Sequence, residues 1–475
     1  MSDLAAWEIA ERVRNKQVSA REVIDEALSR MDGGNVALNA FTVIDRRGAR
    51  KQADAIDEAI ARGEDPGPLA GVPIGVKDLE PAAGLPWTSG SKAFASRVAK
   101  VDSVQVARLR AAGAVVMGKT NTPEFGYKGF TDNLVYGPTR NPWDTSKTSG
   151  GSSGGSASAV AGGLVPLCTA SDGGGSIRIP SAFCGVYGIK PNAGRIPRAG
   201  ENAPGWGVLS QVGPISRTVR DAARYLDATA GPHPSDLESL DGPPGGYEEA
   251  ALAGAPRVAR IAWSGDLGYA VVDPDVQRCA AEAARLLAGA LGAELVEASP
   301  GFDNPIQSWL AIAAPGDTLI VDDVTPEQRE QFERGFVQFA ELGRQITGLD
   351  IARAQEVRHQ VNRRMTAFFE EYDLLLTPTT ATTAFGVESG PPTVIAGKEV
   401  GPAAFLPFTY PFNFTGHPAA SVPAGFAPDG LPVGLQIVAP RFAEKMLLGV
   451  SAAYEAANPF RFPPEPRRAE AAAPA

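Results

Sequence analysis

The chain has 475 residues, of which 44% are hydrophobic, and a formal net charge of −10 from 44 basic and 54 acidic side chains. This length and composition are sufficient for a large buried core. The acidic balance disfavours nucleic acid or an anionic membrane surface as the main partner. No apolar run approaches the ~20 residues that a membrane span requires, so neither kind of partner is expected.

Cysteine and histidine are scarce. The three cysteines, Cys168, Cys184 and Cys279, are too scattered for a disulfide framework, and no spacing typical of zinc ligands occurs. Charged residues near the N-terminus interrupt the apolar segment that a signal peptide needs, which predicts a cytoplasmic protein. A mechanism with a histidine base would have to use one of three residues, His233, His359 or His417.

Helix and strand patterns alternate along the chain. Ser19 and Glu22 form a capping-box pattern, which predicts a helix starting near Ala20. Short buried strands are predicted over residues 37–45, 71–78, 114–117, 257–264 and 293–299, with helical patterns before the third and between the last two. This alternation predicts an α/β fold with a partly parallel sheet. Proline- and glycine-rich loops are predicted at 232–248 and 390–401, and a disordered tail at 466–475.

The sequence GAVVMGKT, from Gly113 to Thr120, matches the pattern of a phosphate-binding loop. Such a loop needs a preceding strand, a turn that exposes main-chain N–H groups, and a helix starting at the lysine. Here the variable positions Val115, Val116 and Met117 have the character of the strand itself. The pattern therefore favours a strand and a turn, with a nucleotide-binding protein as an alternative.

The stretch SGGSSGGSASAVAGG, residues 149–163, contains G-x-S-x-G twice, centred on Ser152 and on Ser153. A nucleophile elbow of this kind is followed in the chain by an acidic residue and then a histidine, an order that this sequence allows. However, an elbow follows a hydrophobic strand, whereas NPWDTSKTSG, residues 141–150, is polar. A histidine-dependent hydrolase is therefore not the favoured interpretation.

A different catalytic arrangement joins separated pieces of the chain. Ser176 lies 24 residues after Ser152 and directly follows the three glycines 173–175. Their unobstructed N–H groups beside one hydroxyl suit an oxyanion hole, which stabilises negative charge on a carbonyl oxygen. Lys77 ends the predicted strand GVPIGVK, where burial would lower its pKa and favour the neutral base.

Six motifs, in order over most of the chain, resemble the amidase signature family. They are GPLAGVPIGVKD (67–78), GKTNTPEFG (118–126), YGPTRNPWD (136–144), GGSSGGSASAVAGG (150–163), SDGGGSIRIPSAFCGVYGIKP (171–191) and PFNFTGHPAASVP (411–423). The resemblance implies a mixed, twisted central sheet with helices on both faces. It also implies a single domain over residues 1–465, with a divergent segment at about 232–372 that determines the substrate.

The family uses a Ser–cis-Ser–Lys triad without histidine. The resemblance implies that Ser176 is the nucleophile, Ser152 the bridging serine beside a cis peptide bond, and Lys77 the base. The main-chain N–H groups of the oxyanion hole would belong to Gly173, Gly174, Gly175 and Ser176. The first of these positions is often an apolar residue in the family and is glycine here, so we expect a somewhat looser loop.

Other residues of these motifs are expected to support the site. Asp172 and Arg178 flank the glycines and are predicted to form an ion pair that holds the loop; Ser153 adjoins the bridging serine. His417 is expected in a loop or at a pocket rim rather than as a base. Aromatic residues either line the substrate pocket or belong to the core: Phe125, Tyr127, Phe130, Tyr136, Trp309, Phe408, Tyr410 and Phe412.

The resemblance implies a hydrolase that cleaves amide bonds of small, largely apolar or aromatic substrates through an acyl-enzyme. The same machinery would act on aryl esters and on carbamates (urethanes). No metal or organic cofactor is expected, and the protein would be a monomer or homodimer. Three alternatives remain: the glutaminase component of a glutamyl-tRNA amidotransferase (its A subunit), acting in a complex; the nucleotide-binding protein described above; and a binding module with an idle site.

Overall fold

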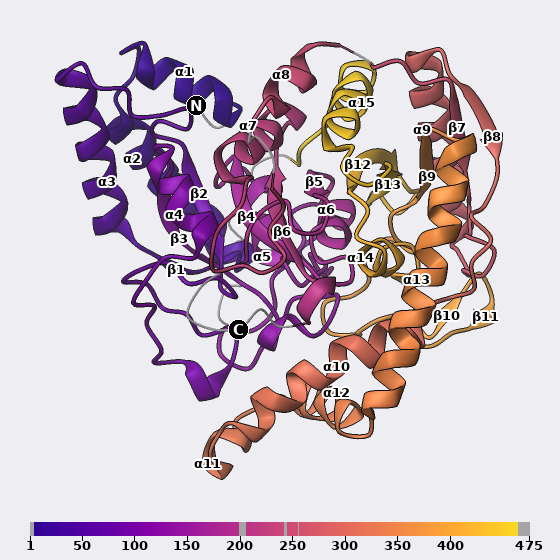
Figure 1. Ribbon diagram of the computed structural model, residues 1–475. Coiled ribbons are helices and arrows are strands. Elements are labelled where there is room, and N and C mark those ends of the chain that lie inside the picture. The colour runs from indigo at the N-terminus through magenta and orange to yellow at the C-terminus, as the bar shows by residue number, and fades with distance from the viewer. Residues whose placement is uncertain (1–3, 199–205, 242–244, 255, 464–475) are drawn as a thin grey trace, which may run out of the picture.

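The computed structural model describes residues 4–198, 206–241, 245–254 and 256–463 (Figure 1). An 11-stranded sheet runs through these residues in the order β1-β3-β2-β4-β6-β5-β12-β13-β9-β7-β8. Its strands are β1 (Phe41–Ile44), β2 (Pro73–Lys77), β3 (Val115–Thr120), β4 (Leu167–Asp172), β5 (Tyr187–Lys190), β6 (Gln211–Ser216), β7 (Arg260–Trp263), β8 (Glu294–Glu297), β9 (Leu374–Pro378), β12 (Ala419–Phe426) and β13 (Pro432–Val438). A separate hairpin pairs β10 (Val394–Ile395) with β11 (Lys398–Glu399).

The sheet is mixed, as the resemblance predicts. Strand β2 is parallel to β3 and β4, and β7 is parallel to β8 and β9, whereas the strands between these two groups pair antiparallel. Parallel neighbours end at the same edge of a sheet. Lys77 at the end of β2 and Asp172 at the end of β4 therefore lie at one edge, where the candidate site is built.

Helices cover the sheet and connect its strands. They are α1 (Ala6–Arg14), α2 (Ala20–Leu38), α3 (Arg46–Ala61), α4 (Val104–Ala111), α5 (Gly154–Ala161), α6 (Arg178–Cys184), α7 (Val219–Thr229), α8 (Tyr247–Leu252), α9 (Pro274–Leu291), α10 (Ile306–Asp322), α11 (Pro326–Arg329), α12 (Arg334–Arg344), α13 (Gly348–Glu371), α14 (Tyr410–Phe414) and α15 (Glu444–Ala457). Short 3₁₀ turns lie at η1 (Lys92–Phe94), η2 (Glu124–Gly126) and η3 (Gly207–Leu209).

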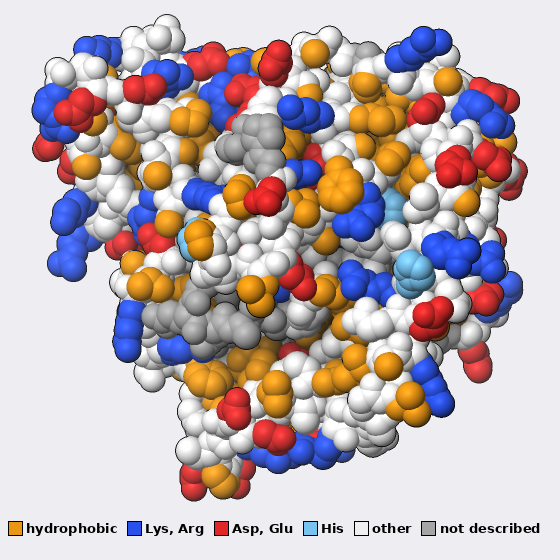
Figure 2. Space-filling view, viewed as in Figure 1, with side chains coloured by type: hydrophobic (Ala, Val, Ile, Leu, Met, Phe, Trp, Pro, Cys, Tyr) orange, Lys and Arg blue, Asp and Glu red, His pale blue; other side chains and the backbone are white. Residues whose placement is uncertain are grey.

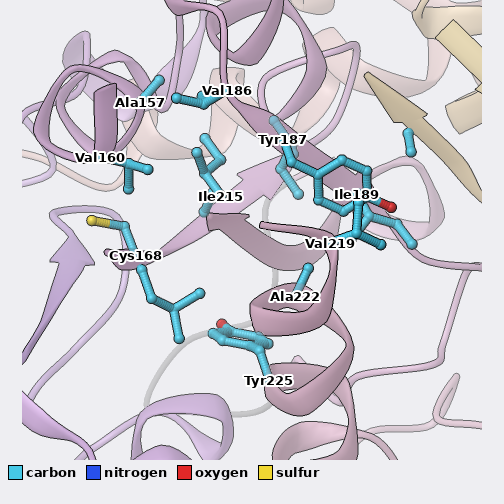
Figure 3. Packing of buried hydrophobic residues seen from close by; sticks show 14 of the residues in the cluster. Ala157, Val160, Cys168, Val186, Tyr187, Ile189, Ile215, Val219, Ala222 and Tyr225 are labelled. Atoms are coloured by element: carbon cyan, nitrogen blue, oxygen red, sulfur yellow. The ribbon is translucent and has the colours of Figure 1, made fainter. Parts of the chain in front are cut away.

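The central strands are buried between α5 and α7. Ala157 and Val160 of α5 and Ala222 and Tyr225 of α7 converge on strand side chains such as Ile215, and all five are completely buried (Figure 3). The small residues of α5 permit this close approach. At Gly155 an added Cβ would lie 2.2 Å from the main-chain nitrogen of Asn121, so any side chain would push α5 away from the sheet.

Helices α10, α11 and α12 project from the body of the molecule beside the C-terminal half of the sheet (Figure 1). Helix α10 packs against both α12 and α13. On the face shown in Figure 2, basic and acidic side chains are interspersed rather than segregated. None of the helices in the described ranges combines the length and the apolar character of a membrane span.

The elements predicted from sequence agree with the structure except at some boundaries. Helix α2 begins at Ala20, and Ser19 and Glu22 cap it reciprocally as predicted. The strand predicted over 37–45 is wrong at its start, because α2 continues to Leu38 and the chain becomes extended only at β1. The loop at 232–248 is confirmed up to α8 within its described residues, whereas the loop at 390–401 contains the β10–β11 hairpin. The predicted tail at 466–475 lies outside the described residues.

The phosphate-loop alternative is wrong. Residues 115–120 are all strand β3, with no turn before Lys119 and no helix starting at it. The Lys119 amine is completely buried, donates to the main-chain oxygen of Glu80 and lies 3.6 Å from a carboxylate oxygen of Asp78. A lysine held in this way is not available to a nucleotide phosphate.

Candidate active site

The Lys77 amine lies at the centre of the candidate site. Its Nζ is 2.8 Å from the Oγ atoms of both Ser152 and Ser153 and 2.9 Å from the Oγ of Ser171. The side chain is completely buried, and its main-chain N–H donates to the Thr169 hydroxyl on β4 (3.0 Å). Strand β2 therefore delivers one amine into a ring of three hydroxyls.

The Lys77 amine has no ion-pair partner within 4.0 Å in the described part of the chain. Burial lowers the pKa of Lys77 to about 7, although the more distant carboxylates of Glu80 and Asp172 favour the charged form. A lysine with this pKa is substantially neutral at physiological pH and can accept a proton.

Ser152 and Ser153 lie where the glycine-rich stretch enters helix α5. Ser153 occupies the N-cap position, and the peptide bond between Gly151 and Ser152 is cis. Gly126, in the loop that contacts Ser152, has a φ of +77°, and a Cβ there would lie 3.2 Å from the Ser152 Oγ. The stretch is thus a packed wall of the site rather than a flexible linker.

Ser176 lies between β4 and α6, close to the two serines. Its main-chain oxygen accepts a hydrogen bond from the Ser153 N–H (3.2 Å), and its side chain is 7% exposed. Among the described residues, the hydroxyls of Ser152 and Ser176 are not hydrogen-bonded to each other. The structure therefore contains the contact between Lys77 and Ser152, and holds Ser176 beside it through the main chain.

Side chains fix the carbonyl groups of the glycine loop. The Gly173 oxygen accepts from Trp309 Nε1 (3.0 Å), and the Gly174 oxygen accepts from Thr409 Oγ1 (2.6 Å). In a trans peptide the next N–H points opposite to the carbonyl. The Gly174 N–H is consequently directed away from Trp309. The loop is held more firmly than the sequence suggested, because both oxygens are anchored by side chains.

The N–H groups of the glycine loop differ in their partners. The Gly175 N–H donates to the Asp172 carboxylate (2.7 Å), so the structure differs from the expectation at this residue. In the described part of the chain, the N–H groups of Gly173, Gly174 and Ser176 have no acceptor in the protein. Such free main-chain donors beside a hydroxyl can stabilise an oxyanion.

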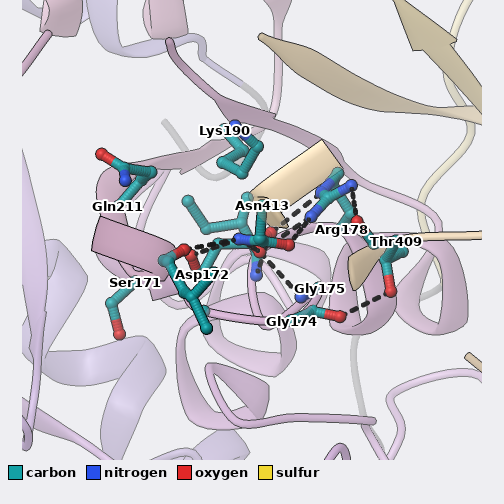
Figure 4. Close-up of polar contacts among 12 residues, drawn as sticks. Ser171, Asp172, Gly174, Gly175, Arg178, Lys190, Gln211, Thr409 and Asn413 are labelled. Atoms are coloured by element: carbon teal, nitrogen blue, oxygen red, sulfur yellow. Dashed lines mark hydrogen bonds and ion pairs between the residues drawn. The ribbon is translucent and has the colours of Figure 1, made fainter. Parts of the chain in front are cut away.

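Asp172 and Arg178 form a buried ion pair beneath the loop (Figure 4). Two guanidinium nitrogens contact the two carboxylate oxygens at 2.8 and 2.9 Å, and both side chains are completely buried. Burial alone would raise the pKa of Asp172, but the guanidinium outweighs it and lowers that pKa to about 2. Asn413 on α14 contacts both members of the pair, and the guanidinium also donates to the Gln436 side chain. The pair thus joins the glycine loop to two distant parts of the chain.

The predicted pocket aromatics fall into different groups. Trp309 contacts the glycine loop, and Tyr410 packs against it with ring centroids 6.2 Å apart. Phe125 and Tyr127 flank Gly126 and pack against Phe336 of α12. Phe408 is completely buried in the core, so its assignment to the pocket is wrong, and Phe412 is core as well. The backbone of Phe130 closes on Gly151, and the main-chain oxygen of Tyr136 accepts from Asn39.

Histidine does not participate in this arrangement. His417 is 2% exposed, its Nδ1 is 2.8 Å from the Thr415 hydroxyl, and its ring packs on Phe369. It lies in a loop, as predicted, but in the interior rather than at a rim. Burial lowers the pKa of His417 to about 3. Within the described ranges, no three His, Cys, Asp or Glu side chains are grouped so as to hold a metal ion.

Sequence analysis missed several residues of the site. Ser171 completes the hydroxyl ring around Lys77, and its position two residues before the first loop glycine was the only available signal. Asn413 lies in one of the quoted motifs, where its role was not recognised. Trp206, which packs on Gly173, had no signal at all.

A lysine–serine pair beside free main-chain donors on a mixed α/β sheet defines a class of serine hydrolases that do not use histidine. Comparison with known proteins gives the family. The model of the Amidase family matches residues 22–448. An acylamidase from Rhodococcus erythropolis is 40% identical over 96% of each chain. The A chain component of a glutamyl-tRNA(Gln) amidotransferase from Acidothermus cellulolyticus is 40% identical over 96% of this chain and 95% of its own.

Solved structures agree with this result. The crystal structure of a bacterial aryl acylamidase of the amidase signature family superposes with a TM-score of 0.91, at 34% identity over 96% of each chain. The chain belongs to the amidase signature family.

Proposed function

We propose that the protein is an acylamidase in which Ser176 is the nucleophile, Ser152 the proton relay and Lys77 the base. The observation that carries the proposal is the 2.8 Å contact between Lys77 Nζ and Ser152 Oγ, in a site whose described residues offer the amine no ion-pair partner. A pKa of about 7 for Lys77 keeps a useful fraction of the amine neutral at physiological pH.

The hydroxyl ring gives the proton transfer a direction. A neutral amine has two N–H donors and one lone pair, so it can donate to only two of the three hydroxyls. Ser153 donates its own proton to the main-chain oxygen of Ser171 (3.2 Å), and can therefore accept from Lys77. The lone pair is then available to the Ser152 hydroxyl, which passes its proton to Lys77 while taking one from Ser176.

Catalysis would proceed through an acyl-enzyme. Ser176 Oγ attacks the substrate carbonyl, and the free N–H groups of the glycine loop stabilise the oxyanion. The proton held on Lys77 returns through Ser152 to the leaving amine, and water then repeats the sequence to release the acid. This cycle needs Ser176 and Ser152 to come within hydrogen-bonding distance when substrate is bound.

The acylamidase relative and the aryl acylamidase structure support an acylated amine as substrate. Trp309, Phe125 and Tyr127 lie beside the glycine loop or Ser152 and favour an apolar or aromatic substrate. Aryl esters and carbamates, including urethanes, present the same carbonyl to the nucleophile, so we infer that they are cleaved as well.

The experiment is a hydrolysis panel of aryl amides, primary amides, aryl esters and carbamates, run on wild type, Ser176→Ala and Ser146→Ala. Ser146 is an exposed serine in a loop and serves as the matched control. We expect Ser176→Ala to remain folded and to lose at least about 10³-fold in kcat, the scale for loss of a covalent nucleophile. An active Ser176→Ala variant would refute the assignment.

The second candidate is the glutaminase component of an amidotransferase, which the amidotransferase relative supports. That function predicts glutaminase activity and stable association with partner subunits when they are co-expressed. An acylamidase instead hydrolyses acylated aryl amines as the isolated chain. Measuring both activities on the same preparation separates the two candidates.

A further inference from the structure

The indole of Trp206 occupies the space beside the first residue of the glycine loop. A Cβ added at Gly173 would lie 2.4 Å from Cε3 of Trp206 and 3.0 Å from Cζ3, closer than real Cβ contacts allow. The φ angle of Gly173 is not positive, so its backbone conformation would accept another residue. The indole ring, rather than the backbone, is what requires glycine here.

Three side chains fix the Trp206 ring. Its Nε1 donates to Asp317 on α10 (2.8 Å), its ring meets Trp309 edge-on with centroids 5.2 Å apart, and it packs on Phe339 of α12 at 6.1 Å. Asp317 is 2% exposed, and burial raises its pKa to about 7. In either protonation state the carboxyl group retains an acceptor for the indole N–H.

Trp206 and Trp309 act on the same loop from adjacent directions. Trp309 binds the Gly173 oxygen and would meet a Cβ at Gly174 at 2.9 Å, whereas Trp206 covers the side-chain position of Gly173. Trp206 itself is only partly buried, so part of its surface remains available beside the loop. Both indoles depend on the projecting helices α10 and α12 for their position.

We propose that Trp206 is a specificity-determining residue: its indole, held by Asp317, fills the place of the side chain missing at Gly173 and limits the size of the substrate group bound beside the oxyanion loop. The inference rests on the proposed function, since it concerns the same loop. Asp317 is a positioning residue that acts through Trp206.

The first test is a pair of compensating substitutions. Gly173→Ala should collide with the indole, displace the loop and reduce kcat/KM by about 10²-fold, the scale for losing one oxyanion donor. Gly173→Ala combined with Trp206→Ala removes the collision and should recover at least about tenfold of that loss. A double variant no better than Gly173→Ala alone would overturn the proposal.

The second test measures size selectivity. Two substrate series are used, 4-nitroanilides with acyl groups from acetyl to benzoyl, and acetylated amines from aniline to 2-naphthylamine. Trp206→Ala should raise the ratio of kcat/KM for large over small substrates about tenfold in one series, because methylene-sized differences in a pocket are worth this much or more. Unchanged ratios in both series would overturn the proposal.

Asp317 provides a conservative rescue. Asp317→Asn keeps an oxygen acceptor for the indole and should retain the wild-type ratio within about twofold, whereas Asp317→Leu should resemble Trp206→Ala. Equal ratios in these two variants would contradict the positioning role. Fluorophosphonate labelling of Ser176 in every variant distinguishes the hypotheses. Labelling without the predicted selectivity changes refutes this inference alone, and an unlabelled wild type refutes the proposed function together with it.

Discussion

Two buried cations lie at the same edge of the sheet and have opposite electrostatic situations. The Arg178 guanidinium is paired with Asp172 through two short contacts and also donates to Gln436. The Lys77 amine is equally buried but is surrounded by hydroxyl groups. The carboxylate of the first site has its pKa lowered to about 2, whereas the lysine of the second has its pKa lowered to about 7.

Burial alone therefore does not determine the state of a charged group. Removing a charge from water costs several kcal/mol, and a group either gains a counter-charge or becomes neutral. Arg178 has the counter-charge and serves as a structural anchor for the glycine loop. Lys77 has no counter-charge in contact among the described residues and is left as a base. The following substitutions test this contrast, from the largest expected effect to the smallest.

Lys77→Met removes the base while nearly preserving side-chain volume. We expect kcat for an aryl amide to fall at least about 10³-fold, comparable to removal of other triad members. Lys398→Met, at an exposed position on β11, is the control and should remain active. More than a tenth of wild-type activity in Lys77→Met would contradict the role of the lysine.

The same variant makes a prediction about stability. Between pH 7 and 10.5 the unfolded chain binds a proton at Lys77 that the folded protein does not, so wild-type stability rises with pH through this window. Lys77→Met should be at least as stable as wild type at pH 7, and its relative advantage should shrink as the pH approaches 10.5. Thermal unfolding at several pH values measures this, and a strongly destabilised variant at pH 7 would contradict it.

Arg178→Met should have its main effect on folding. It leaves the Asp172 carboxylate buried without its partner, which typically costs about 3–5 kcal/mol. Arg344→Met removes exposed ion pairs to Asp322 and Glu341 and should cost no more than about 1 kcal/mol. Urea unfolding of the two variants tests the comparison, and equal losses would contradict it.

Ser153→Ala should have the smallest effect. It removes one of three acceptors for the Lys77 ammonium, which lowers the lysine pKa further and moves the acid limb of the pH profile to lower pH. We expect kcat to fall about tenfold through the lost hydrogen bond. Ser158→Ala loses a buried hydrogen bond in the same helix without contacting Lys77, and should not move the acid limb. An acid limb that stays in place in Ser153→Ala would contradict the role of this hydroxyl.

The sequence predicted the part of the site that lies in contiguous motifs. Lys77, Ser152 and Ser176 come together because β2, α5 and the start of α6 meet at one edge of the sheet, as the motif order implied. The partner of the Gly175 N–H was not predicted, because the path of a turn depends on side chains that anchor it. The contacts of Trp206 and Asp317 depend on how the divergent helices pack back on the loop, and no local pattern encodes this.

Boundaries and burial were the other weak points. Ala37 and Leu38 suit a strand as well as a helix, and the continuation of α2 through them depends on packing. Phe408 shows the same limit, because an aromatic residue near a motif is compatible with either a pocket or a core. These differences arise from tertiary packing, which overrides local preference.

The central claim is that a neutral lysine, acting through a serine, activates Ser176. The most direct measurement is the pre-steady-state rate of acylation of Ser176 by an aryl amide as a function of pH, followed by the release of the amine. The account predicts an acid limb with an apparent pKa near 7, below which protonated Lys77 cannot accept the proton. An acylation rate that is constant from pH 5 to 9 would contradict it.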